Sequence, residues 1–497
     1  MALACAFLLY AAVSSVANGF WLARQRFQFD YEEGNVLNAA LRINAGLTPY
    51  PPPGSWPVVL NCYGPIPYAL TASLIRFRAP EFFRPRTISL IGALVVAFEV
   101  GLLVFHFTSS RVLALSLGAF FLSIPQVQEW APLLRVDFLG LALALAGLVV
   151  FFFWPRLYFV PSALFALALL CKITFLAAPV AWAAVLIRQK RWRDLGKGVL
   201  AGAGLLGATV AALQWTTHGA FLFHQFGTHV DSISWTKYRS NASEALGQTY
   251  FLVALSVVGF ARSRKLSAAL IYLLAAILGT VTALKVGSSS NHLLEFNAAI
   301  CVCAALALWE MQRTRGRPLE ADGLVALCLA VLAAQAMTYR ATYTAKGVVD
   351  ECPQAYAYIR AHQRVLSENV GALVLTGRQV LLSNPFVYAQ LVRNGKWQPG
   401  QVEEMLERGN ADLVMAAKPR FDDQRWSEPA MEALAANYHV TRHFACVDAT
   451  LAYEPNLRFT KLRREPRMAA PTSVGLITKH ATGTASNLLS HAAGQER

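Results

Sequence analysis

The chain has 497 residues, of which 55% are hydrophobic and only 15% carry a charge. This composition excludes an ordinary soluble globular protein, and recurrent apolar runs of about 15–20 residues predict a polytopic helical membrane protein. The net charge of +15 does not indicate a nucleic-acid partner, because most Lys and Arg residues lie in short loops between apolar runs. In that position they set membrane topology and anchor lipid headgroups.

The first apolar run, residues 1–20, lacks the basic start of a signal peptide and is expected to be an uncleaved transmembrane helix. Shortly after it, Asp30, Glu32 and Glu33 place three carboxylates within four residues. An ionised carboxylate near hydrocarbon is costly, so this cluster is either a solvated interfacial feature or part of a functional site.

The acidic cluster belongs to a first outer loop that we place at residues 21–62. Within this loop, the apolar spacing over 36–45 predicts a short amphipathic helix lying along the membrane face. The segment 50–57 contains four prolines and is expected to be extended.

Further apolar runs bring the expected total to about 11–13 transmembrane helices. The run at 157–187 is too long for one simple span and contains Pro161, Lys172 and Pro179, so we expect two short, broken helices there. The runs after the first lie near residues 62–77, 88–107, 111–126, 137–154, 157–187, 197–217, 248–261, 266–284, 293–309 and 323–338.

Basic loops predict the orientation of these spans. Clusters of Lys and Arg lie at 76–86, 188–197, 262–265 and 313–317. Taken as one cytoplasmic face, they place 218–247, 285–292 and everything after Tyr339 outside. One conflict remains: three apolar runs separate Glu33 from Asp137, so both acids lie outside only if one of these runs does not cross.

Several ionisable residues lie at membrane depth or close to it. Asp137 follows Arg135 at the start of an apolar run, Lys172 lies well inside another, and Lys285 ends a third. Asn291, His292 and Glu295 come shortly after Lys285. Each has a structural explanation: a snorkelling lysine, a structural Arg135–Asp137 ion pair, an interface anchor or ordinary turn residues. Together they also provide the acids and cations of a site that deprotonates a hydroxyl and binds a phosphate.

Residues 341–460 differ in composition and are expected to form a small extracytoplasmic α/β domain. It carries no glycine-rich phosphate loop after a strand, so nucleotide binding is not supported. Its expected helices lie at 350–366, 399–409 and 427–437, and its β-rich runs lie at 372–376, 412–416 and 439–447.

Cys352 and Cys446 both lie in this part of the chain, where they could form a disulfide if it is extracytoplasmic. Residues 461–497 are rich in Arg, Ser, Thr and Ala without periodicity, which predicts a disordered tail.

The acidic stretch Glu32-Glu33-Gly34, followed by Ala39-Ala40, Gly46 and Tyr50, resembles the first-loop motif of GT-C membrane glycosyltransferases. That superfamily includes bacterial aminoarabinose transferases and protein O-mannosyltransferases, where the usual acidic pair is Asp-Glu. The resemblance covers roughly residues 1–310. Its further matches are Asp137 before a span, Lys172 with Phe175, Leu176 and Pro179, the stretch 190–195, and the Lys285 loop.

The resemblance implies a transmembrane catalytic domain, 1–340, that transfers a sugar from a polyprenyl-phosphate carrier with inversion. The acceptor would be a lipid, a glycan or a protein, on the outer face of a bacterial cytoplasmic membrane. Glu32 matches the catalytic acid of the family, and Asp30 and Glu33 remain alternative bases. Asp137 would orient the acceptor or hold a divalent cation such as Mg or Mn.

In the same resemblance, cations would hold the donor phosphate and polar side chains would contact the substrates. The phosphate-binding candidates are Lys172, Lys285 and Arg135, and the substrate-binding candidates are Tyr50, Asn291, His292 and Glu295. Two other functions stay open. The same cations would serve a transporter or flippase of a lipid-linked anion, and the α/β domain could bind a partner in an assembly.

Overall fold

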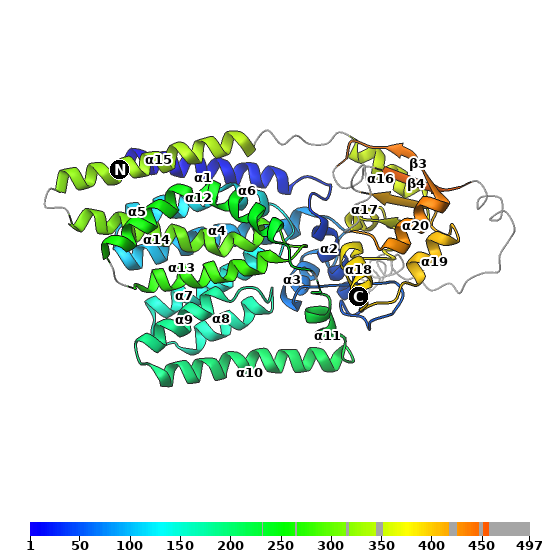
Figure 1. Ribbon diagram of the computed structural model, residues 1–497, viewed down its shortest axis with the longest axis horizontal. Helices are drawn as coiled ribbons and strands as arrows, with labels where there is room; N and C mark the ends of the chain where they lie inside the picture. Colours follow the sequence, from blue (N-terminus) through cyan, green and yellow to red (C-terminus); the bar gives the residue numbers. More distant parts are fainter. Residues whose placement is uncertain are drawn as a thin grey trace, which may run out of the picture.

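The computed structural model consists of a long helical bundle with a small α/β unit at one end (Figure 1). The structure describes residues 1–230, 232–263, 266–314, 318–343, 351–416, 425–446 and 451–456. The expected tail, 461–497, lies outside the described residues.

Within these ranges, six helices are long and apolar enough to cross a membrane. They are α1 (Ala2–Ala23), α4 (Phe83–Thr108), α10 (Trp192–Thr216), α12 (Trp235–Ser263), α14 (Leu294–Thr314) and α15 (Pro318–Tyr343). Shorter apolar helices complete the bundle: α5 (Arg111–Ser123), α7 (Asp137–Phe153), α8 (Phe159–Leu169), α9 (Ala177–Arg188) and α13 (Ala268–Gly279). The prediction of a polytopic helical membrane protein is confirmed.

The run at 157–187 forms two short helices, as predicted. Pro161 and Pro179 each lie in a first helical turn, where a missing N–H costs no intrahelical hydrogen bond. Lys172 lies in the break between α8 and α9. The break therefore delivers a charged side chain to one end of the bundle.

Helix α3 (Pro65–Ile75) resolves the conflict over the side of the two acids. With 11 residues it is too short to span about 30 Å of hydrocarbon, and it packs against α2 (Tyr31–Asn44). Helix α4 therefore begins at the end of the bundle that carries Glu33, where Arg86 contacts this acid. We call this the acidic end.

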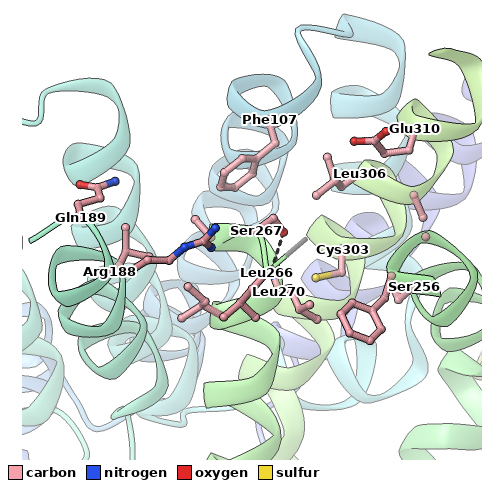
Figure 2. A pocket seen from close by; sticks show the side chains of 16 residues that line it. Phe107, Arg188, Gln189, Ser256, Leu266, Ser267, Leu270, Cys303, Leu306 and Glu310 are labelled. Carbon is pink, nitrogen blue, oxygen red and sulfur yellow. Dashed lines mark hydrogen bonds between the residues drawn. The ribbon is translucent and has the colours of Figure 1, made fainter. Parts of the chain in front are cut away.

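The same finding corrects the predicted orientation of the basic loops. A cavity at the other end of the bundle is lined by Phe107, from the end of α4, and by Arg188, from the end of α9 (Figure 2). The cluster at 188–197 is therefore at the opposite end from Arg86. The prediction that the cluster at 76–86 shares its face was wrong, because the run at 62–77 does not cross.

The amphipathic helix predicted for 36–45 also differs in the structure. Helix α2 begins at Tyr31, and α3 and α17 (Val370–Leu375) pack against it. Its residues from Glu33 to Ala40 are all buried. Gly34 lies so close to Gly371 that a Cβ at Gly34 would come within 2.2 Å of the Gly371 nitrogen. The helix is thus enclosed between the bundle and the α/β unit.

The α/β unit contains a four-stranded sheet in the order β1-β2-β4-β3, with β1 and β2 parallel and the other pairs antiparallel. Its strands are β1 (Val365–Ser367), β2 (Leu413–Ala416), β3 (Tyr438–His443) and β4 (Leu451–Pro455). Its helices are α16 (Cys352–Ala361), α17, α18 (Pro385–Arg393), α19 (Gln401–Glu407) and α20 (Glu428–Asn437). The α/β prediction is confirmed.

Two local predictions in this unit had different outcomes. The expected strand at 372–376 was wrong, because Asn369 caps a helix there by accepting a hydrogen bond from the Ala372 N–H at 3.0 Å. The disulfide that Cys352 and Cys446 could form, which the sequence left open, is present and joins α16 to the segment after β3.

Candidate active site

The three acids of the first loop form the N-terminus of α2. Asp30 is the N-cap, and its Oδ1 accepts a hydrogen bond from the Glu32 N–H at 3.1 Å. Glu33 accepts in return from the backbone N–H groups of Phe29 and Asp30, at 2.8 and 3.3 Å. This capping box explains locally why acids gather at this helix start.

Glu33 has no exposed surface and is held by a bidentate ion pair. Arg86 donates to both of its carboxylate oxygens, at 2.7 and 2.8 Å, and the Leu134 N–H donates at 2.7 Å. Burial alone would raise the pKa of Glu33, but Arg86 and the backbone N–H donors outweigh it and lower the pKa. Both oxygens are therefore committed to contacts that join α2 to α4.

Glu32 has a different environment, because two neutral amides hold its carboxylate. Asn35 donates to Oε2 and Asn384 to Oε1, both at 3.1 Å. No described cation forms an ion pair with it. Burial raises the pKa of Glu32 above the usual value, although Arg135 opposes this shift. A carboxylate of raised pKa that lacks a bonded cation is suited to accept a proton.

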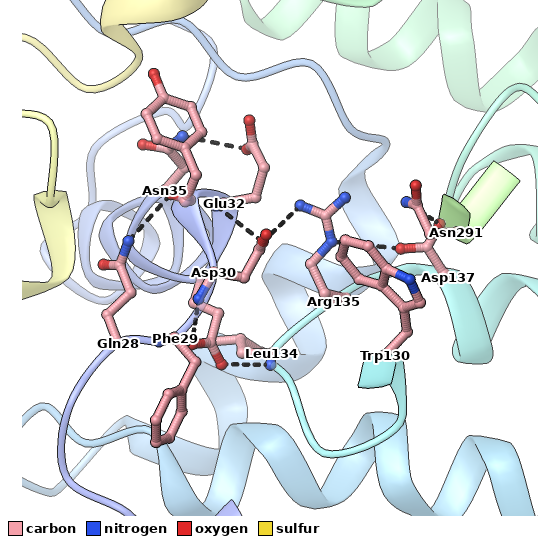
Figure 3. A network of polar contacts seen from close by, with 12 residues as sticks. Gln28, Phe29, Asp30, Glu32, Asn35, Trp130, Leu134, Arg135, Asp137 and Asn291 are labelled. Carbon is pink, nitrogen blue, oxygen red and sulfur yellow. Dashed lines mark hydrogen bonds and ion pairs between the residues drawn. The ribbon is translucent and has the colours of Figure 1, made fainter. Parts of the chain in front are cut away.

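Arg135 connects the first loop to the bundle (Figure 3). Its Nη1 lies 2.8 Å from Asp30 Oδ1, and its Nε lies 3.4 Å from Asp137 Oδ2. Its guanidinium also lies 5.2 Å from the centre of the Trp130 ring, a distance typical of a cation–π contact. The charge of Arg135 is therefore shared between the carboxylates of Asp30 and Asp137. Its contact with Asp137 agrees with the structural ion pair considered for these two residues above.

Asp137 begins α7 and also binds Lys172. The Lys172 ammonium lies 2.7 Å from Asp137 Oδ1, and Asn291 donates to the same oxygen at 3.0 Å. Only 8% of Lys172 is exposed, so the lysine is a buried ion-pair partner and does not snorkel to the surface.

A small cavity brings five predicted residues together. Its lining includes Asp137, Lys172, Asn291, His292 and Glu295. The side-chain amide oxygen of Asn291, Oδ1, is buried and lacks a hydrogen-bond partner among the described residues, which leaves an acceptor for a bound group.

His292 and Glu295 are fixed by neighbouring elements. The Nδ1 of His292 lies 2.9 Å from the Thr282 hydroxyl, and Glu295 Oε1 accepts from the Ala178 N–H at 2.9 Å. Glu295 therefore caps α9 as well as lining the cavity.

Lys285 and Tyr50 lie outside this cavity lining. Lys285 is partly exposed after a 3₁₀ turn (Thr280–Leu284) and forms no ion pair with any described residue. Burial lowers the pKa of His229 to about 4, and the charges of Lys285 and Lys172 add to this effect.

Tyr50 is buried, and its hydroxyl donates to the Tyr63 carbonyl at 2.8 Å.

Sequence reasoning missed Arg86, Asn35 and Asn384. Arg86 was present in a basic cluster, but that cluster was interpreted only as a topology signal. Asn35 lies one helical turn from Glu32 and could have been found from α2 alone. Asn384 lies 352 residues from Glu32, and no local pattern marks that contact.

The residues around Asp137 do not fit a divalent cation. Lys172 and Arg135 both approach its carboxylate, so a metal ion there would face two positive charges. Among the described residues, no group of three or more His, Cys, Asp or Glu side chains could hold a metal ion.

These features define a polytopic membrane protein with an acid–cation network between its bundle and an α/β unit. No protein-family profile matches the sequence, and no curated protein is similar to it in sequence.

Solved structures do show the same architecture. ArnT from Cupriavidus metallidurans matches with a TM-score of 0.61 at 12% identity, over 94% of this chain and 98% of that one, both in the apo state and with undecaprenyl phosphate. The oligosaccharyltransferase AglB from Archaeoglobus fulgidus, with an inhibitory peptide and a dolichol-phosphate, matches with a TM-score of 0.54 at 13% identity, over 92% of this chain and 74% of that one. The chain therefore has the GT-C fold.

Proposed function

We propose that this protein is an inverting membrane glycosyltransferase that uses a polyprenyl-phosphate-linked sugar. One observation carries the proposal: Glu32 has a partly buried carboxylate without a bonded cation, and its backbone N–H joins it through Asp30, Arg135 and Asp137 to a cavity lined by Lys172. A base and a buried cation at one end of a bundle are the two groups that such a transfer requires. The ArnT structure with undecaprenyl phosphate supports a lipid-phosphate donor.

In the proposed reaction, the oxygen of the acceptor hydroxyl attacks the anomeric carbon of the sugar. Glu32 takes the proton of this hydroxyl during the attack. The bond from that carbon to the phosphate oxygen breaks, and its electron pair leaves with the polyprenyl phosphate. Lys172 and Lys285 stabilise the negative charge that develops on this leaving group. A single displacement inverts the anomeric configuration.

The other predicted residues receive supporting roles in this proposal. Glu33 anchors α2 through Arg86 and does not act as the base, because both its oxygens are occupied. Asp30 and Asp137 hold Arg135 between them, and Asp137 orients Lys172. Asn291, His292 and Glu295 shape the donor cavity, whereas Tyr50 holds the backbone of Tyr63 outside its lining.

We place the acidic end and the α/β unit outside the cytoplasm of a bacterium. The Cys352–Cys446 disulfide favours an oxidising compartment for this unit, and the basic cluster at 188–197 lies at the other end of the bundle. The proposal assigns 1–340 to the catalytic domain and 341–460 to the extracytoplasmic α/β domain. The sugar, and whether the acceptor is a lipid, a glycan or a protein, are left to experiment.

The test uses membranes of cells that lack the gene, which supply both the donor and the acceptor. Purified protein is added, and mass spectrometry follows the release of polyprenyl phosphate and the new glycosylated product. Glu32→Gln should lower the rate by about 10²-fold or more, as loss of a general base does. Glu404→Gln, on the exposed side of α19, is the matched control.

Full activity of Glu32→Gln would refute the assignment of the base. Movement of a labelled polyprenyl-phosphate sugar across reconstituted vesicles without any sugar transfer would instead establish the flippase alternative.

A further inference from the structure

The α/β unit reaches the proposed base through one buried side chain. Asn384 precedes α18, has no exposed surface, and donates from Nδ2 to Glu32 Oε1 at 3.1 Å. This contact makes a residue of the unit a direct partner of the carboxylate at the start of α2.

The orientation of the Asn384 amide is fixed by its other contacts. Its Oδ1 accepts from the Tyr31 hydroxyl at 2.8 Å and from the Val387 N–H at 3.1 Å. The Tyr31 hydroxyl in turn accepts from the Phe386 N–H at 2.9 Å. Because two donors face the carbonyl oxygen, the amide nitrogen must point to Glu32.

The backbone around Asn384 is tied to the first loop as well. The Val58 N–H donates to the Leu381 carbonyl at 2.9 Å, and the Ser383 N–H donates to the Val58 carbonyl at 3.0 Å. The Ser383 hydroxyl also accepts from the Leu60 N–H at 2.8 Å. The position of Asn384 relative to Glu32 is thus held from two sides.

We propose that Asn384 is a positioning residue for Glu32 and that the α/β unit thereby completes the acceptor half of the site. This inference rests on the proposed function. A neutral amide can fix the direction of the carboxylate and favour its charged form without neutralising it as an arginine would. The unit is then a required part of the catalytic site and not an accessory module.

Two substitutions separate this role from helix capping. Asn384→Ser keeps an oxygen that can cap α18 but removes the amide nitrogen that donates to Glu32. Asn384→Asp keeps the acceptor and places a second carboxylate against Glu32. Asn369→Ser is the matched control, because Asn369 is a buried N-cap of α17 in the same unit and is not among the described hydrogen-bond partners of Glu32.

The readout is the pH dependence of polyprenyl phosphate release, with membranes of cells lacking the gene as the source of donor and acceptor. Loss of a hydrogen bond to a carboxylate raises its pKa, so Asn384→Ser should shift the acidic limb of the profile upward. Its rate at neutral pH should fall about tenfold or more, since hydrogen bonds to charged groups are among the strong ones. Asn384→Asp should shift the limb further, whereas Asn369→Ser should keep the wild-type profile.

Tyr31→Phe provides a second variant with little change in shape. It removes the hydroxyl that orients the amide, and it should shift the limb in the same direction by a smaller amount. An unchanged limb in Asn384→Ser and Tyr31→Phe, or equal losses in Asn384→Ser and Asn369→Ser, would overturn the inference. An inactive wild-type protein would instead refute the proposed function.

Discussion

The three acids at the start of α2 have different surroundings although they are neighbours in the sequence. Arg86 neutralises Glu33, Arg135 pairs with Asp30, and among the described residues the Glu32 carboxylate accepts hydrogen bonds from two neutral amides. Composition cannot distinguish these three cases, because the partners come from distant parts of the chain. The resemblance to a family motif selected Glu32, and the geometry provides a physical reason for the same choice.

The pH dependence of transfer should identify the base. The pKa of Glu32 is raised by burial, above about 4.3 for an ordinary glutamate, whereas the pKa of Glu33 is lowered by Arg86. A base must be ionised, so activity is lost as the pH falls through its pKa. We expect the acidic limb of kcat/KM to lie above pH ~4.3. An acidic limb below pH ~4.3 would favour Glu33 as the base.

Arg86 should be important for stability. Arg86→Ala leaves the Glu33 carboxylate buried without its partner, which should cost about 3–5 kcal/mol. Arg408→Ala removes an exposed pair with Glu404 and should cost about 0–1 kcal/mol. Thermal unfolding of the detergent-solubilised protein measures both. Equal shifts for the two variants would contradict a structural role for the buried pair.

At the scale of elements, the short helices place the charges of the site. The prolines at 161 and 179 predicted the broken pair α8 and α9, and the break carries Lys172 to Asp137. The sequence could not predict that α3 stays at the acidic end, because an apolar run of 16 residues fits either a crossing or a buried helix. The run at 372–376 is similarly ambiguous, and only the Asn369 cap decides in favour of a helix.

Lys172 should control the affinity for the lipid phosphate. Undecaprenyl phosphate should stabilise the wild-type protein against thermal unfolding, by an amount that grows with its concentration. Lys172→Gln should lose most of this stabilisation, because the cavity then lacks its buried cation. Lys396→Gln, on the exposed surface of the α/β unit, should behave like the wild type. An unchanged ligand shift in Lys172→Gln would exclude its phosphate role.

At the scale of the whole molecule, the bundle and the α/β unit build the site together. Hydropathy and basic loops predicted the bundle, and alternating helix and strand patterns predicted the unit. Neither pattern predicts the contact between them, because Glu32–Asn384 and Gly34–Gly371 pair residues more than 300 positions apart. Such contacts depend on shape complementarity, which no local periodicity encodes.

The disulfide should stabilise the α/β unit. Cys352 and Cys446 close a loop with a sequence separation of 94, and its loss should cost about 2–5 kcal/mol. A reductant should lower the unfolding temperature of the wild type and of Cys328→Ala, whose target is a free thiol. The same reductant should not affect Cys352→Ala. If a reductant still lowers the unfolding temperature of Cys352→Ala, the stabilisation comes from a bond other than Cys352–Cys446.

Transfer should not require a metal ion at Asp137. Since Lys172 and Arg135 occupy the surroundings of this carboxylate, treatment with EDTA should leave the rate of polyprenyl phosphate release unchanged. A loss of activity that Mg or Mn restores would contradict this expectation and place a cation elsewhere in the reaction.

The contact between Asn384 and Glu32 also has a consequence for biosynthesis. The three carboxylates leave the ribosome early, whereas their amide partner is translated 352 residues later. At about 5–20 residues per second, this interval lasts roughly 20–70 seconds. During that time the growing chain carries the acids of the site without the residue that orients one of them. On the proposed function, a chain that ends before the α/β unit would therefore carry its base without this orienting contact.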